Sequence, residues 1–189
     1  NSSGRFKCIV PQHLEQSTSR SVEIRNNDLL QIVKSDLILL NFDGTELDSG
    51  TVVEFLFAKV LDIPAVILRT DFRSAGDQDR GDPWNLMCSA YPRTRIITLN
   101  SMTWYQEEWK KGGEISEIIE RFYKKLSRKI NNEFEIVLRE SPIYNNEKIL
   151  SNVYEWAINF PGSGFKDLFK EEDLKNVILK KQKKGSILT

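Results

Sequence analysis

The sequence has little of what many functional sites require. Its 189 residues include two cysteines and one histidine, which excludes zinc sites built from several Cys or His ligands. The 27 Lys and Arg residues balance 27 Asp and Glu residues, so no strong field favours nucleic acid or an acidic membrane as partner. No apolar run reaches the roughly 18–20 residues of a membrane span, and the polar start does not resemble a signal peptide. We therefore expect a cytoplasmic protein without a metal site, whose chemistry, if it is an enzyme, rests on carboxylates.

What is present is an alternation of short apolar strands and amphipathic helices. Strands are predicted over residues 6–10, 36–42, 64–68 and 95–99, and helices over residues 22–33, 51–61 and 114–129. The run Leu37–Phe42 is apolar on both faces, which is typical of a central strand in a parallel sheet. The alternation predicts an α/β fold of the flavodoxin- or Rossmann-like kind, with a parallel sheet of about four to five strands flanked by helices.

The character of the sequence changes after about residue 131. Residues 134–138 have the composition of an edge strand, and helices are predicted over residues 147–159 and 167–181. We expect residues 1–130 to form the α/β domain, and residues 131–189 to form a helical C-terminal extension packed on the same domain.

Parallel sheets bind ligands beyond the carboxyl ends of their strands, which directs attention to the loops after Phe42 and Leu68. Carboxylates and two glycines crowd the first of these loops, from Asp43 to Glu54. Glu54 lies near the start of a predicted helix, where the helix dipole favours the ionised form that a nucleophile needs. Thr51 and Glu54 also have the spacing of a capping box, in which Glu54 bonds the Thr51 amide and does no chemistry. The pattern alone leaves both interpretations open.

Three separated segments resemble motifs of the nucleoside 2-deoxyribosyltransferase family. Asp48–Glu54 (DSGTVVE) resembles its D-x-G-T-x-x-E signature, and Pro83–Met87 (PWNLM) resembles its N-L-M substrate loop. Residues 24–36 resemble the family's helix followed by entry into a strand. Order and spacing agree over about residues 6–130. The family's first strand, with a tyrosine and a glycine-rich turn, has no match, so it is either outside these residues or absent; Leu56–Phe57 replaces the usual Gly-Tyr.

The resemblance implies a role for each matching residue. Glu54 would attack the anomeric carbon of a 2'-deoxynucleoside and form a deoxyribosyl ester. Asp28 and Asp48 would lie at the base, where one of them supplies or relays the proton that lets the base leave. Asp43 and Gly50 are candidate substrate contacts, Asp43 on position alone. Asn85 and Met87 would approach the sugar in a neighbouring subunit's site, which implies a homodimer or a higher homo-oligomer. No cofactor is implied, and the partners are a small nucleoside or nucleotide and a free base.

Three function classes remain open from the sequence. The first is a deoxyribosyltransferase that exchanges bases, which needs one carboxylate as nucleophile and an acid about 5–5.5 Å away. The second is a hydrolase that releases the base from a deoxynucleoside or its 5'-monophosphate, and the third is a non-catalytic nucleotide-binding module. Asp71 and Arg73, after the third predicted strand, would order the substrate loop or pair with each other. His13 is expected to be an exposed loop residue, and Cys88 a small packing residue.

Overall fold

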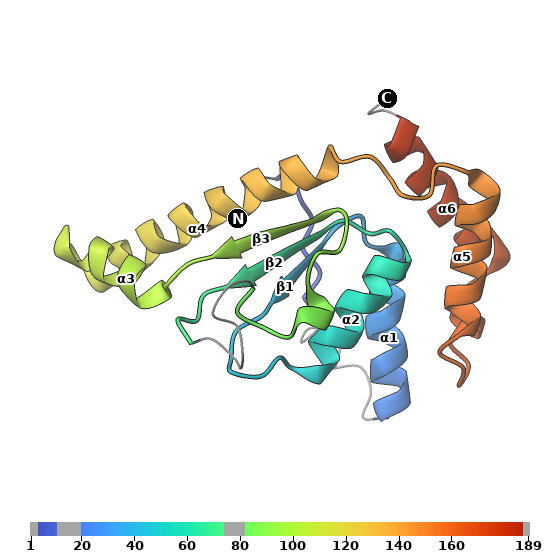
Figure 1. Cartoon of the computed structure of the whole chain (residues 1–189), viewed down its shortest axis with the longest axis horizontal. Coiled ribbons are helices and arrows are strands. Elements are labelled where there is room, and N and C mark those ends of the chain that lie inside the picture. The colour runs from blue at the N-terminus through green and yellow to red at the C-terminus, as the bar shows by residue number, and fades with distance from the viewer. Residues whose placement is uncertain (1–3, 11–19, 74–81, 187–189) are drawn as a thin grey trace.

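The centre of the molecule is a three-stranded parallel sheet. The computed structural model describes residues 4–10, 20–73 and 82–186 (Figure 1), so His13 lies outside the described residues. The strands β1 (Ile38–Asn41), β2 (Ala65–Arg69) and β3 (Thr94–Thr98) lie in the order β1-β2-β3. Leu40 pairs with Ile67, which pairs in turn with Ile96. The predicted α/β fold with a parallel sheet is confirmed. Among the described strands β2 is central and β1 lies at an edge, so the central position predicted for residues 37–42 is wrong.

Helices cover both faces of this sheet (Figure 1). Ala65 and Ile67 of β2 pack in one buried cluster with Phe55 of helix α2 (Ser49–Val60). Val66, which points to the opposite face as strand geometry requires, packs in a second cluster with Phe134 of helix α4 (Ile115–Leu138). The sheet is therefore the middle layer of three, and both of its faces are apolar.

The remaining helices lie beside α2 and beyond the ends of the sheet. They are α1 (Ser21–Lys34), α3 (Ser101–Lys110), α5 (Glu147–Asn159) and α6 (Glu171–Ser186), with short 3-10 turns η3 (Leu86–Cys88) and η4 (Lys166–Leu168). The helices predicted over residues 22–33, 51–61 and 147–159 are confirmed within two residues at each end. Among the described residues, no helix combines the length and the apolar composition that a membrane span requires.

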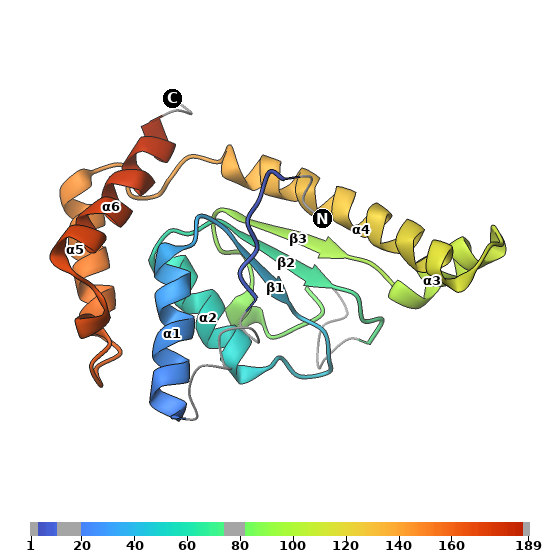
Figure 2. The same cartoon turned by 180° about the vertical axis from the view of Figure 1, so that it is seen from behind.

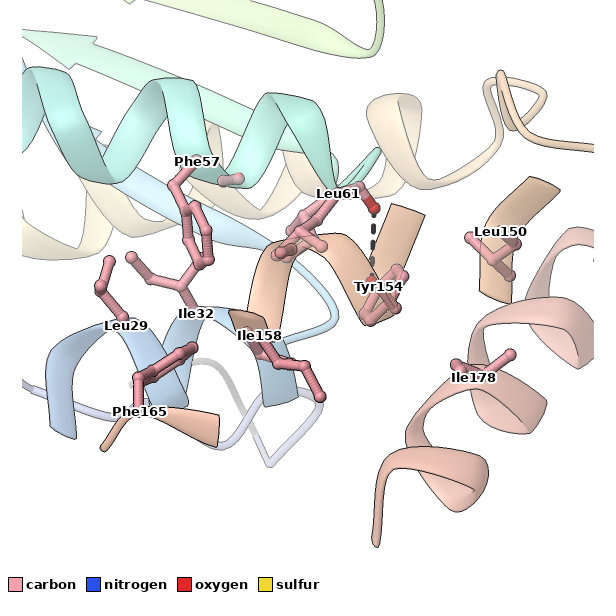
Figure 3. Packing of buried hydrophobic residues seen from close by; sticks show 13 residues of the cluster. Leu29, Ile32, Phe57, Leu61, Leu150, Tyr154, Ile158, Phe165 and Ile178 are labelled. Carbon is pink, nitrogen blue, oxygen red and sulfur yellow. Dashed lines mark hydrogen bonds between the residues drawn. The ribbon is translucent and has the colours of Figure 1, made fainter. Parts of the chain in front are cut away.

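The C-terminal extension packs against the outer side of α1 and α2. Leu150, Tyr154 and Phe165 lie in the same buried cluster as residues of both helices. Figure 3 shows Phe165 beside Leu29 and Ile32 of α1, and Tyr154 beside Leu61 at the end of α2. The Tyr154 hydroxyl donates a hydrogen bond of 3.3 Å to the Leu61 carbonyl. Helix α4 crosses residues 130 and 131 without a break, so the change in sequence character there marks no boundary between elements.

Two predicted strands are wrong. Residues 6–10 form no strand; they pass along the α4 side of the sheet (Figure 2), where the Phe6 ring meets the Phe134 ring edge-on at 5.0 Å between centroids. Residues 134–138 are the last turns of α4, because Phe134 and Val137 continue the apolar stripe of that helix onto the sheet. The described residues therefore contain three strands in the sheet, against the four to five expected. The helix predicted over residues 167–181 begins later, at Glu171.

Candidate active site

Asp48 caps the N-terminus of α2, directly after the loop that follows β1. Its Oδ2 accepts hydrogen bonds from the Thr51 amide at 2.7 Å and from the Thr51 hydroxyl at 3.0 Å. These bonds, together with one from the Gly50 amide, hold the pKa of Asp48 below its usual value. The capping box considered from the sequence is wrong, because α2 begins at Ser49 and its cap is Asp48. Glu54 is therefore not needed to cap the helix.

Gly50 lies in this first turn of α2 for a steric reason. A Cβ atom at this position would lie 3.1 Å from Asp48 Oδ2, which is tighter than ordinary van der Waals contact. A larger residue would push against the capping carboxylate. The structure thus connects the glycine of the D-S-G-T segment with the position of Asp48.

Glu54 lies on the next turn of α2 and is half-buried. Burial raises its pKa above the usual value, and the like charges of Asp28 on α1 and Asp48 raise it further. The expected stabilisation of its ionised form by the helix dipole is therefore outweighed. Within the described part of the chain, Glu54 makes no hydrogen bond or ion pair that would hold its charge. The structure brings together the three carboxylates that the sequence proposed as catalytic.

Asp43 is bonded to the loop that follows β2. Its Oδ1 accepts from the Thr70 amide at 2.5 Å and the Asp71 amide at 3.0 Å, and its Oδ2 accepts from the Thr70 hydroxyl at 2.7 Å. Asp71 in turn accepts from the Gly44 amide at 3.0 Å and forms an ion pair with Arg73 at 2.5 Å. Of the two roles considered for Asp71 and Arg73, the pairing is present. Each loop thus contributes a carboxylate that accepts hydrogen bonds from the backbone of the other loop.

Arg69 is a member of this network that the sequence analysis missed. It is the last residue of β2, it is fully buried, and it donates to the carbonyl oxygens of Phe42, Gly44 and Arg73. The signal in the sequence is a charged residue that directly continues a strand apolar on both faces, at the edge where ligands bind. A buried guanidinium is stable only when carbonyls or carboxylates accept its protons.

Asn85 directly precedes η3, and Met87 lies within it; η3 packs beside α2. The Asn85 side chain accepts from the Met87 amide at 2.9 Å, and the preceding Trp84 is buried, with its ring 5.3 Å from that of Phe42. Leu86 and Met87 are 64% and 75% exposed. The loop is therefore anchored through Trp84 while it presents two apolar side chains to solvent. Cys88, as expected, is buried in the cluster beneath α2.

No group of three or more His, Cys, Asp and Glu side chains within the described ranges is placed to hold a metal ion.

Residues 5–87 match the family model for nucleoside 2-deoxyribosyltransferase. The resemblance inferred from the three motifs is confirmed over this range, which contains all of them. The nucleoside 2-deoxyribosyltransferase match includes α1, β1, α2, β2 and the loop up to Met87, and it supports an enzyme related to that family with a nucleoside as substrate. No curated protein and no solved structure gives a significant match to the chain.

Proposed function

We propose that the protein cleaves the N-glycosidic bond of a 2'-deoxynucleoside and transfers the deoxyribosyl group to another base. The observation that carries the proposal is the state of Glu54. Its carboxylate is half-buried, is not bonded by the described residues, and lies near two further carboxylates in a segment that matches the family. A carboxylate in these surroundings is available as a nucleophile.

In the proposed first step, a Glu54 oxygen attacks the anomeric carbon and the carbon–nitrogen bond breaks. The bonding electrons pass to the base nitrogen, which takes a proton. Asp48, whose lowered pKa keeps it ionised at neutral pH, is poorly suited to donate that proton. We therefore propose that Asp28 carries this proton in the free enzyme and donates it to the base.

In the second step, a nitrogen of the incoming base attacks the same carbon and the ester bond to Glu54 breaks. The proton of the incoming base returns to Asp28, so the enzyme ends in its starting state. Burial and repulsion from Asp48 destabilise the Glu54 anion, and both penalties fall when the ester removes the charge. Two of the features that raise the pKa of Glu54 thus favour formation of the intermediate.

The proposed assembly is a homodimer or a higher homo-oligomer in which the Asn85–Met87 segment completes a neighbouring site. The exposed Leu86 and Met87 side chains support this proposal. A specific interface of this kind buries at least about 1,000 Å² in total. Sedimentation at micromolar concentration should give a dimer or larger, and an active monomer would exclude this arrangement.

The test of the mechanism is to trap the intermediate with a 2-fluoro-2-deoxy-arabinosyl nucleoside, whose fluorine slows breakdown of the ester. Intact mass should increase by one glycosyl group, mapped to Glu54 by peptide analysis. An adduct on any other residue would end the mechanism.

The reaction class is tested separately by incubating the protein with a deoxynucleoside, with and without a second free base. A new nucleoside identifies the transferase that we propose. Release of free base alone identifies a hydrolase, and no reaction in either arm supports a non-catalytic nucleotide-binding module.

A further inference from the structure

The loops after β1 and β2 are joined by several hydrogen bonds that the proposed mechanism does not use. We call the four residues Asp43, Arg69, Thr70 and Asp71 the loop clamp. Asp43 binds the backbone and hydroxyl of Thr70 and the backbone of Asp71, while Asp71 binds the backbone of Gly44. Arg69 reaches across from β2 to the carbonyls of Phe42 and Gly44. Within residues 42–44, a backbone amide donates to Asp71 and two backbone carbonyls accept from Arg69.

The burial of Arg69 shows how strongly this arrangement is specified. Its side chain is completely buried, and the acceptors that its bonds reach are main-chain carbonyls. Carbonyl dipoles compensate a buried charge only when several point at it, so the loops have to hold their shape around the guanidinium. The terminal nitrogens make these bonds, while Nε has no acceptor among the described residues. A shift of either loop would leave further donors of this buried cation without acceptors.

The clamp acts on the chain immediately before the catalytic helix. Only residues 45–47 separate Gly44 from the cap Asp48. Gly44 has a φ of +105°, and a Cβ there would lie 3.0 Å from the Glu46 carbonyl oxygen, so this turn is tight. Leu47 packs against the cluster that contains Phe42 and Phe55. The short segment between the clamp and Asp48 therefore has little conformational freedom.

We infer that the loop clamp is a positioning device: it fixes Asp48 relative to Glu54, and Asp43 contributes through this device instead of holding the sugar. The inference rests on the proposed function for its catalytic consequence. Asp43 uses both carboxylate oxygens on Thr70 and Asp71, and these bonds define the clamp. Through Asp48, the clamp also sets how strongly the Glu54 anion is repelled.

Thr70→Val separates the two roles of Asp43. The variant removes the hydroxyl bond to Asp43 Oδ2 and keeps the amide bond to Oδ1, so it loosens the clamp without touching the Asp43 carboxylate. We expect kcat to fall by about tenfold to a hundredfold with KM nearly unchanged, because a small misplacement of catalytic groups slows the chemical step. If Asp43 instead holds the sugar, freeing its oxygen should leave kcat intact. Thr94→Val is the matched control, because its hydroxyl bonds the Pro92 carbonyl at the start of β3.

A second readout does not depend on turnover. Loosening the clamp lets Asp48 move away from Glu54, and the groups that raise the pKa of Glu54 besides burial are Asp28 and Asp48. NMR titration of the Glu54 carboxyl should therefore give a lower pKa in Thr70→Val and in Arg69→Lys than in wild type, while Thr94→Val titrates as wild type. The titration is measured well below the unfolding temperature. Under that condition, a residue that only stabilises the fold would leave the pKa of Glu54 unchanged.

The outcomes separate the inference from the proposed function. An unchanged Glu54 titration in both clamp variants overturns the positioning role, whether or not the protein is active. A raised KM with an unchanged kcat in Asp43→Asn also overturns it and assigns Asp43 to the sugar. An inactive wild type with a shifted titration in the variants overturns the proposed function and leaves the positioning of Asp48 standing.

Discussion

The two ends of helix α2 are built in opposite ways. At its N-terminal end, Asp48, Glu54 and the neighbouring Asp28 place like charges close together, and Glu54 is half-buried with a raised pKa. At its C-terminal end, the Tyr144 hydroxyl donates to the Val60 carbonyl at 3.0 Å, and the Tyr154 hydroxyl donates to the Leu61 carbonyl. One end concentrates unfavourable electrostatics, and the other removes unsatisfied carbonyls.

Buried charges at the C-terminal end are matched by nearby partners. The Arg93 guanidinium donates to the Asp62 carbonyl at 2.7 Å and pairs with its carboxylate at 2.8 Å. The Lys59 ammonium donates to the carbonyls of Ile63 at 2.9 Å and Arg93 at 3.0 Å. The difference teaches that α2 can hold a destabilised carboxylate at one end because the other end is fixed to the strands and to the C-terminal extension. Substitutions at each end of α2 test this difference.

The largest effect is expected from Glu54→Gln. Turnover should fall by roughly three or more orders of magnitude, because the anionic nucleophile is lost. The same change should raise the unfolding midpoint by about 1–3 °C at neutral pH, because it removes a half-buried charge and its repulsion from Asp48. Kinetic assays and thermal unfolding of both proteins measure the two quantities.

The pH dependence gives this experiment an internal control. The folded-state pKa of Glu54 lies above the unfolded value, so wild type loses stability relative to Glu54→Gln as the pH rises between the two values. Below the unfolded pKa both states are protonated and the difference should vanish. A fully active variant, or one less stable than wild type at neutral pH, would contradict the description of this end.

Asp62→Asn tests the opposite end of the helix. It should lower the free energy of unfolding by about 2–4 kcal/mol, because Arg93 keeps its buried charge without its carboxylate partner. Turnover per folded molecule should change little. Denaturant unfolding measures the loss, and Asp36→Asn is the matched control, with an expected change of at most about 0.5 kcal/mol because its side chain is half-exposed. Equal effects in the two variants would remove the contrast.

The pH dependence of the unfolding free energy tests the C-terminal end of α2 through Lys59. Burial lowers its pKa from 10.5 to about 8, although the nearby carboxylate of Asp62 opposes this shift. Between these two values the unfolded state binds more protons, so this group makes the protein more stable as the pH rises from about 8 to 10.5. Compared with Lys59→Met, wild type should gain at most about 3 kcal/mol over this interval. Parallel curves of unfolding free energy for the two proteins would show that Lys59 is not desolvated.

The smallest effect is expected at Asp48. Asp48→Ala removes the cap of α2 and should cost about 1 kcal/mol of stability, whereas Asp48→Asn keeps an oxygen that accepts from the Thr51 amide. Both variants remove the charge that repels the Glu54 anion, so the acidic limb of the kcat/KM profile should move to lower pH in both. A limb that moves only in Asp48→Ala would assign the effect to helix geometry and not to charge.

Much of the fold was predictable because its elements have clear periods. The runs that became β1, β2 and β3 are short and apolar, and α1, α2 and α5 show helical spacing with defined ends. Residues 134–138 were mistaken for a strand because Phe, Ile and Val favour strands when read in isolation. Their place in the apolar stripe of α4, which packs on β2 and β3, overrides that preference. Residues 6–10 show the reverse, because they have a strand-like composition but pair with no strand among the described residues.

The catalytic carboxylates were predictable as a motif, but not their electrostatics. The sequence places Glu54 near a helix start, and from this alone a lowered pKa follows. The raised pKa depends on burial and on Asp28, which lies on another helix and approaches only in the fold. The loop clamp was hidden for the same reason, because Asp43 and Thr70 are far apart in sequence and their bond exists only when β1 and β2 are neighbours.

Helix α4 places a constraint on how this chain can change in length. Near its start, Phe122 packs against Trp104 of α3, and near its end Phe134 and Val137 pack on the sheet. Each residue of an α-helix turns the chain by about 100°. A one-residue deletion between Phe122 and Phe134 would rotate one contact set away from its partners, whereas loops accept such changes at low cost. We therefore expect this 24-residue helix to be inherited at fixed length, while the connections on either side of it vary.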